Sequence, residues 1–170
     1  MSGDEEVDLV DASDQVVGSA PLRACLEQGL LHRAVAVLVV RSNGSLLLQQ
    51  RSRNDLWHPG LWTLSSTGHV RKGETYARAA RRELEEELGM AARLKRISKV
   101  LLPAITSGRL TEREWVSMFT TVSDRSPRID PVELEQVEEV SKLRLARMLN
   151  GPELTPDAKI LLAAYRRDPH

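Results

Sequence analysis

The chain has 170 residues, a length typical of one domain, and its hydrophobic fraction of 41% is enough for a packed core. Its 24 basic and 24 acidic residues balance, which argues against a dedicated nucleic-acid or membrane-surface binder. One cysteine excludes an intramolecular disulfide. There is no signal-peptide pattern and no apolar run of roughly 20 residues, so we expect a cytoplasmic protein with no membrane partner. We expect a flexible tail over residues 1–6 and a single domain over residues 7–170, and the oligomeric state stays open.

The first half of the chain predicts strands separated by turns and one short helix. Pro21 favours the start of that helix and Gly29 its end. Asn43-Gly44 is the strongest short hairpin signal. The strands expected here occupy residues 7–10, 15–17, 33–41, 46–51 and 61–67.

The second half contains the best helix pattern, over Tyr76–Leu88. Thr75 can cap its N-terminus, and Gly89 can take the left-handed conformation after its C-terminus. Its buried stripe is formed by Ala80, Leu84 and Leu88. The other elements expected are strands over 94–102, 114–122 and, at an edge, 137–140, a loop over 103–111, and a helix over 143–149. Thr155-Pro156-Asp157 predicts the start of a last helix with Ile160, Leu161 and Ala164 on its apolar face.

An acidic cluster lies on the Tyr76–Leu88 helix. Glu83, Glu86 and Glu87 stand at i, i+3 and i+4, so they share one face and repel each other. A divalent cation would convert this repulsion into attraction, and grouped hard oxygens suit Mg²⁺ or Mn²⁺. Arg82 can hold one carboxylate in a fixed rotamer, as a metal site requires. The alternative is a solvated acidic helix face.

These residues resemble the box of the Nudix family. The pattern is Gly, five residues, Glu, seven residues, then Arg-Glu-apolar-any-Glu-Glu-any-Gly-apolar. The matching residues are Gly68, Glu74, Arg82, Glu83, Leu84, Glu86, Glu87, Gly89 and Met90. The resemblance implies an α/β fold, an α/β/α sandwich with a mixed β-sheet.

The resemblance also implies a metal site, filled by Mg²⁺ with Mn²⁺ as a substitute. Its ligands would be Gly68, Glu83, Glu86 and Glu87. Arg82 and Glu74 would be supporting residues, although an acid at the position of Glu74 is equally well explained as an ordinary helix-start residue.

Outside the box the chain resembles isopentenyl diphosphate isomerases, a branch of the same superfamily. The segments that carry this likeness are 31–34, 47–51, 59–63, 112–114 and 154–156. Thr67 stands where the isomerases use a cysteine, and a hydroxyl is far less acidic than a thiol. The complete box and the missing cysteine favour a hydrolase, and isomerase activity is the alternative.

Four further residues match the isomerase metal site in part: His32, His69, Glu112 and Glu114. Cys25 takes the place of another histidine in that pattern. The histidines have packing as their alternative role. The glutamates are either surface charges or a ligand or base outside the box.

For a hydrolase, the resemblance assigns the catalytic work to Glu83, Glu86 and Arg82. Glu83 is the expected base, with Glu86 and Glu112 as competitors. The substrate is a small-molecule nucleotide, with nucleoside 5′-di- or triphosphates as first choice. A non-catalytic nucleotide sensor is a third interpretation.

Three residues are candidates for binding the rest of the substrate. Arg51 and Arg53 present the paired donors that suit phosphate, and Trp57 can stack on a base. Their alternative roles are solvated strand-end charges for the arginines and a place in the core for the tryptophan.

Overall fold

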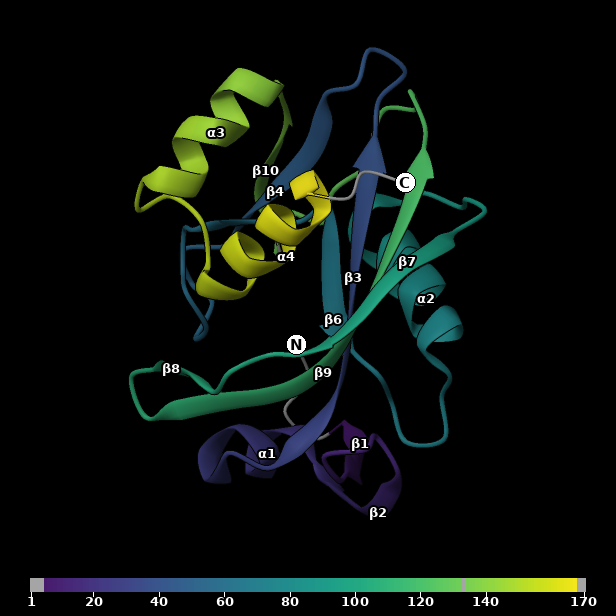
Figure 1. Cartoon of the computed structure of the whole chain (residues 1–170), viewed down its shortest axis with the longest axis vertical. Coiled ribbons are helices and arrows are strands. Elements are labelled where there is room, and N and C mark those ends of the chain that lie inside the picture. Colours follow the sequence, from purple (N-terminus) through teal and green to yellow (C-terminus); the bar gives the residue numbers. More distant parts are fainter. Residues whose placement is uncertain (1–4, 133, 168–170) are drawn as a thin grey trace.

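The computed structural model in Figure 1 describes residues 5–132 and 134–167. The strands are β1 (Glu6–Val10), β2 (Val16–Pro21), β3 (Leu31–Val40), β4 (Leu46–Arg51), β5 (Trp62–Thr63), β6 (Ser66–His69), β7 (Lys95–Leu101), β8 (Ile105–Ser107), β9 (Leu110–Val122) and β10 (Leu134–Val140). The helices are α1 (Leu22–Gln28), α2 (Tyr76–Leu88), α3 (Lys142–Asn150) and α4 (Pro156–Arg167). The order and type of the expected elements are confirmed, apart from the segments corrected below.

Strand β3 is the centre of a mixed sheet. It pairs in parallel with β9 along its whole length, and antiparallel with β1, β4 and β6. Strand β10 lies beyond β4 at an edge, as predicted, and β7 and β8 both pair with β9.

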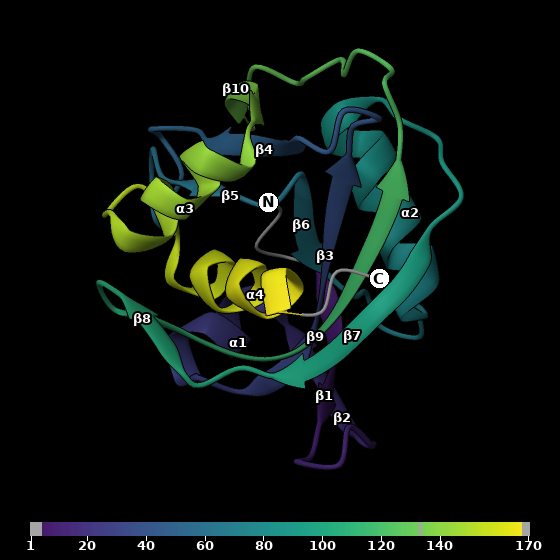
Figure 2. The ribbon, with the colours of Figure 1, turned by 45° about the horizontal axis from the view of Figure 1, so that its top comes forward.

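Alternating side chains of β3 face two separate cores. Residues 34, 36 and 38 pack against the core that includes α3 and α4, whereas residues 35, 37 and 39 pack against α2. Figure 2 shows α2 on one side of the sheet and α3 and α4 on the other. The predicted α/β/α sandwich is therefore confirmed.

Helix α2 has the bounds that its end signals predict. The Thr75 hydroxyl accepts a hydrogen bond from the backbone N–H of Arg78, and Gly89 takes the left-handed conformation at φ 60°. Leu84 and Leu88 are fully buried beneath the sheet. Burial of each such side chain stabilises the fold by roughly 1.5–3 kcal/mol, so the apolar stripe fixes which face α2 turns outward.

The sheet splits beside α2. Strands β3 and β4 pair only next to their connecting turn and then diverge. In this gap, the segment expected as one strand over 61–67 forms two, because β5 pairs with β4 and β6 pairs with β3. Ser65 bridges the change of partner: its hydroxyl accepts a hydrogen bond from the Val39 N–H at 2.7 Å and donates one to the Leu47 carbonyl.

Glu5 and Glu6 do not belong to a flexible tail, contrary to expectation. Their carbonyls accept backbone hydrogen bonds from the N–H groups of Leu22 and Lys72, and Glu6 begins β1. Residues 1–4 lie outside the described residues. None of the helices in the described part is long and apolar enough to cross a membrane.

Two other expectations need correction. The loop expected over 103–111 contains β8, which folds back on the start of β9 through a turn at Gly108 with φ 60°. Ile160 was expected on the apolar face of α4 but is 39% exposed, since the helix is rotated to bury Ala158, Leu161 and Leu162.

Candidate functional site

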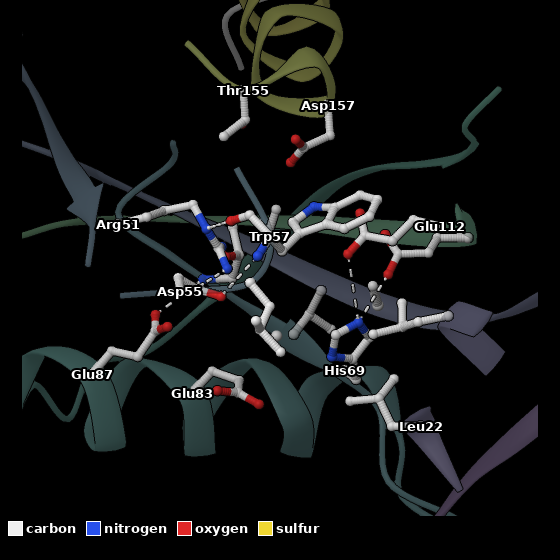
Figure 3. A pocket seen from close by; sticks show the side chains of 18 of the residues that line it. Leu22, Arg51, Asp55, Trp57, His69, Glu83, Glu87, Glu112, Thr155 and Asp157 are labelled. Atoms are coloured by element: carbon white, nitrogen blue, oxygen red, sulfur yellow. Dashed lines mark hydrogen bonds and ion pairs between the residues drawn. The ribbon is translucent and has the colours of Figure 1, made fainter. Parts of the chain in front are cut away.

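A cavity of about 830 Å³ lies at the split in the sheet. One wall is formed by α2 and β6, another by the start of β9 and the first turn of α4, and a third by the loop after β4. In Figure 3, Glu83 and Glu87 rise from α2, while Asp157 and Thr155 project from the opposite side. A volume of this size is typical of small-molecule sites.

The carboxylate of Glu83 lies against the backbone of β6 at Gly68. A Cβ atom at Gly68 would come within 2.6 Å of Glu83 Oε2, and closer still to the other carboxylate atoms, so only glycine leaves room for this approach. Burial raises the pKa of Glu83 to about 7, against the opposing effect of the Arg82 charge. The structure thus brings together two residues that the box pattern places 15 positions apart.

The guanidinium of Arg82 connects the parts of the box. It donates to both carboxylate oxygens of Glu74 at 3.1 and 2.9 Å, and to the His69 carbonyl at 3.0 Å. It also donates to Glu83 at 2.5 Å and to Glu86 at 3.3 Å. Burial would raise the pKa of Glu74, but the bonds from Arg82 hold it below its usual value. Glu74 and Arg82 thus hold each other in place through two hydrogen bonds.

Glu86 and Glu87 line the same cavity but have different partners. Glu86 is half-exposed and shares Arg82 with Glu83. Glu87 is buried, and its Oε2 accepts hydrogen bonds at 3.1 Å from the Thr67 N–H and from Gln49 Nε2. Glu87 therefore satisfies an amide at the open edge of β6.

Strand register gathers a second group of polar side chains on another wall. Glu114 stands opposite His32, and His69 stands opposite Ala34, so all three side chains share a face. Glu114 Oε1 lies 3.3 Å from His32 Nε2 and 3.1 Å from His69 Nε2, and Glu112 Oε1 lies 4.0 Å from His69 Nε2. The ligand atoms of His32, His69 and Glu114 lie within 4.8 Å of one another, close enough to share one metal ion.

The donor set of this second group fits a metal. His32 Nδ1 lies 2.8 Å from the Leu30 carbonyl, which can only accept, so this nitrogen carries the proton. Its buried Nε2 then faces Glu114 with no hydrogen-bond partner among the described residues. Burial opposes protonation of Nε2, but Glu114 raises the pKa of His32 overall. A divalent cation at Nε2 would also satisfy this nitrogen.

The two glutamates of this wall differ in charge. Burial and the neighbouring Glu114 raise the pKa of Glu112 well above its usual value. Burial would also raise the pKa of Glu114, but the nearby imidazoles of His32 and His69 lower it overall. Glu114 is therefore the anionic partner of the histidines.

The three candidate substrate-binding residues are not placed alike. Arg51 lines the cavity, with its guanidinium bound to the Trp57 carbonyl at 2.7 Å and to Asp55 at 2.5 Å. Trp57 also lines the cavity but is 4% exposed and packs in the core. Arg53 lies outside it, 78% exposed and 3.9 Å from Glu135, because the chain turns after the end of β4.

Sequence reasoning missed the contribution of α4. Thr155 and Asp157 were interpreted as a helix start, yet both line the cavity (Figure 3). A threonine and an acid around a proline are typical of helix starts, so nothing local marked them as site residues. The likeness to isomerases, which extends to residues 154–156, was the one available signal.

In comparisons with known proteins, residues 30–164 match the family model of the NUDIX domain. An isopentenyl-diphosphate Delta-isomerase of Serratia proteamaculans is 41% identical over 130 residues, which cover 76% of this chain and 73% of that protein. A protein of Pseudomonas aeruginosa named uncharacterized Nudix hydrolase PA4841 is 36% identical over 88% of this chain and 80% of its own length. Among solved structures, DR0079 of Deinococcus radiodurans superposes with a TM-score of 0.74 at 27% identity, covering 94% of this chain and 98% of that one.

Proposed function

The chain belongs to the Nudix family, in a branch that resembles isopentenyl diphosphate isomerase, and from that premise we propose that it is a Mg²⁺-dependent hydrolase of nucleoside 5′-di- or triphosphates that releases the monophosphate. Family membership supports pyrophosphate hydrolysis in general. The observation that carries the proposal is the complete box at the cavity wall, where Gly68 admits Glu83 and Arg82 fixes it.

Each box residue has a defined task in this proposal. Glu83, Glu86 and Glu87 would hold Mg²⁺, or Mn²⁺ in its place, together with the Gly68 carbonyl. When bound, the metal would neutralise phosphate charge and lower the pKa of a bound water. Arg82 keeps Glu83 in its rotamer, and Glu74 keeps Arg82 in place.

The base that deprotonates the attacking water is Glu83 in this proposal. Glu83 lies at the wall beside Gly68, whereas Glu86 is half-exposed and Glu112 lies at a different wall. The water oxygen bonds to phosphorus, its proton passes to the Glu83 carboxylate, and the bridging P–O bond breaks. The products are a nucleoside monophosphate and phosphate or diphosphate.

Isomerase activity is the second candidate, and two observations favour it. The buried group of His32, His69 and Glu114 matches the isomerase pattern, and the Serratia relative carries an isomerase name. The missing thiol opposes it. Thr67 lies at the cavity wall, whereas the single cysteine, Cys25 of α1, is buried in a separate core and is not part of the cavity lining. A hydroxyl is a poor acid or base for proton transfer at carbon.

One experiment separates the candidates. The purified chain is incubated with Mg²⁺, a panel of nucleotides and isopentenyl diphosphate, and products are resolved by ³¹P NMR. Chelator-sensitive release of nucleoside monophosphate supports the proposal. Dimethylallyl diphosphate formed without phosphate release would establish the isomerase instead. Nucleotide binding without any product in Mg²⁺ or Mn²⁺ would indicate a sensor.

A further inference from the structure

Asp157 is an acidic side chain without a cation partner in the cavity. It belongs to the first turn of α4 and lines the cavity from the side opposite Glu83 and Glu87 (Figure 3). Within residues 5–132 and 134–167, it takes part in no ion pair. The guanidinium of Arg51 is already bound by Asp55 and by the Trp57 carbonyl.

Thr155 adds a second polar group beside Asp157. Thr155 is only 2% exposed. Its hydroxyl has no hydrogen-bond partner of acceptable geometry among the described residues. Burial raises the pKa of Asp157, and the nearby Thr155 hydroxyl partly offsets this. A buried hydroxyl without a partner costs free energy unless something else in the cavity binds it.

The charge at this wall sets the orientation of a diphosphate. The phosphates need metal ions, which the α2 wall can gather, whereas the Asp157 carboxyl has no cation partner among the described residues with which to bind them. The end of the substrate that reaches α4 is therefore its non-phosphate part. Carboxylate and hydroxyl oxygens accept hydrogen bonds, so they favour a group with N–H or O–H donors.

We propose that Asp157 and Thr155 form the recognition site for the non-phosphate part of the substrate, and that they select a group with polar hydrogens over a hydrocarbon. This inference rests on the proposed function. The amino or imino edge of a nucleobase and the hydroxyls of ribose both carry such donors. A prenyl chain carries none, so the same two residues disfavour the isomerase substrate.

The test measures binding rather than turnover. The probes are α,β-methylene analogues of nucleoside diphosphates, which resist hydrolysis at that linkage, and methylenebisphosphonate, which carries the phosphate-like part alone. Binding of each is measured by calorimetry in Mg²⁺ with the unsubstituted chain, Asp157→Asn and Thr155→Val. Both variants keep the size of the side chain. Glu153→Gln is the matched control, because it removes a carboxylate next to the same helix but outside the cavity lining.

We expect Asp157→Asn to lower the affinity for the best nucleoside probe about 10- to 100-fold, as loss of a hydrogen bond to a charged group does. Thr155→Val should lower this affinity by a smaller factor. Affinity for methylenebisphosphonate should stay within about twofold of the unsubstituted chain in both variants, and Glu153→Gln should change neither affinity.

Repeating the titration with the 2′-deoxy form of the best probe identifies the donor. If Asp157 binds the ribose 2′-hydroxyl, Asp157→Asn adds little to the loss caused by the deoxy group. If it binds the base, the loss is the same for both probes.

An unchanged nucleoside affinity in well-folded Asp157→Asn and Thr155→Val would overturn the inference and leave the proposed function standing. If the affinity for methylenebisphosphonate fell as much as that for the nucleoside probe, the inference would also be overturned. Asp157 would then act on the metal and phosphate end of the ligand. If the unsubstituted chain binds methylenebisphosphonate but no nucleoside probe, the proposed substrate class itself fails.

Discussion

Replacing Gly68 by alanine tests the contact on which the proposed site depends. The added Cβ would lie 2.6 Å from Glu83 Oε2 and nearer to the rest of the carboxylate, whereas nonbonded heavy atoms prefer roughly 3.5 Å or more. The carboxylate must therefore retreat by at least about 1 Å. It is the end of a flexible side chain on the surface of a cavity, so it can move without disturbing the core.

The expected consequence is a loss of activity without a loss of stability. A displacement of about 1 Å in a catalytic arrangement costs roughly 100-fold in rate, equivalent to about 2.7 kcal/mol of transition-state stabilisation. Alanine in place of glycine in a strand is neutral or slightly stabilising for the fold. We expect kcat to fall about 100-fold, the Mg²⁺ concentration for half-maximal rate to rise, and the melting temperature to stay within a few degrees.

The assay is the release of nucleoside monophosphate against Mg²⁺ concentration, with thermal unfolding followed by circular dichroism. Gly18→Ala is the matched control, since Gly18 also lies in a strand and its added Cβ would meet Leu9 Cδ1 at an ordinary 3.8 Å. Full activity and unchanged Mg²⁺ dependence in Gly68→Ala would refute the argument that Glu83 must occupy this position.

Glu86→Gln should lower kcat by about three decades, as loss of a metal ligand does, and leave the melting temperature nearly unchanged because Glu86 is half-exposed; near-normal turnover in a steady-state assay would contradict its role. Arg82→Lys keeps the charge but loses the paired hydrogen bonds to Glu74, so kcat should fall roughly 10- to 100-fold. A change in KM alone would contradict a positioning role. Asp14→Asn should destabilise the fold by about 1–3 kcal/mol at pH 7 in urea unfolding, because it breaks a buried ion pair with Arg33. Burial would raise the pKa of Asp14, but its bonds to cations hold it below the unfolded value of about 3.9. The stability that Asp14 contributes is therefore present above that value and lost as the pH falls through the folded pKa, and a gap between the two proteins that persists in acid would refute this account.

Helix α2 shows how far local chemistry determines the fold. Its cap at Thr75, its end at Gly89 and its buried leucines are all encoded within 15 consecutive residues, because helix hydrogen bonds and capping are local. Its bounds and the residues of the box were therefore predictable from the sequence. Strand positions were predictable for the same reason wherever apolar runs ended in strong turn signals, as at Asn43-Gly44.

The segment over 61–67 marks the limit of such reasoning. Its composition is typical of one strand, and no residue in it predicts that the pairing changes at Ser65 from β4 to β3. That change depends on where β3 and β4 diverge, which is set by packing on both faces of the sheet. The same divergence creates the cavity.

The sequence by itself determined the box, the helix that carries it and the metal chemistry that its carboxylates suit. Only the tertiary structure decided which distant residues join it. The gathering of His32, His69 and Glu114 depends on strand register between segments up to 82 residues apart, and the place of Asp157 depends on how α4 packs across the sheet. Arg53 turns to solvent for the same kind of reason. Register and packing are minima of the whole chain's free energy, so no local pattern encodes them.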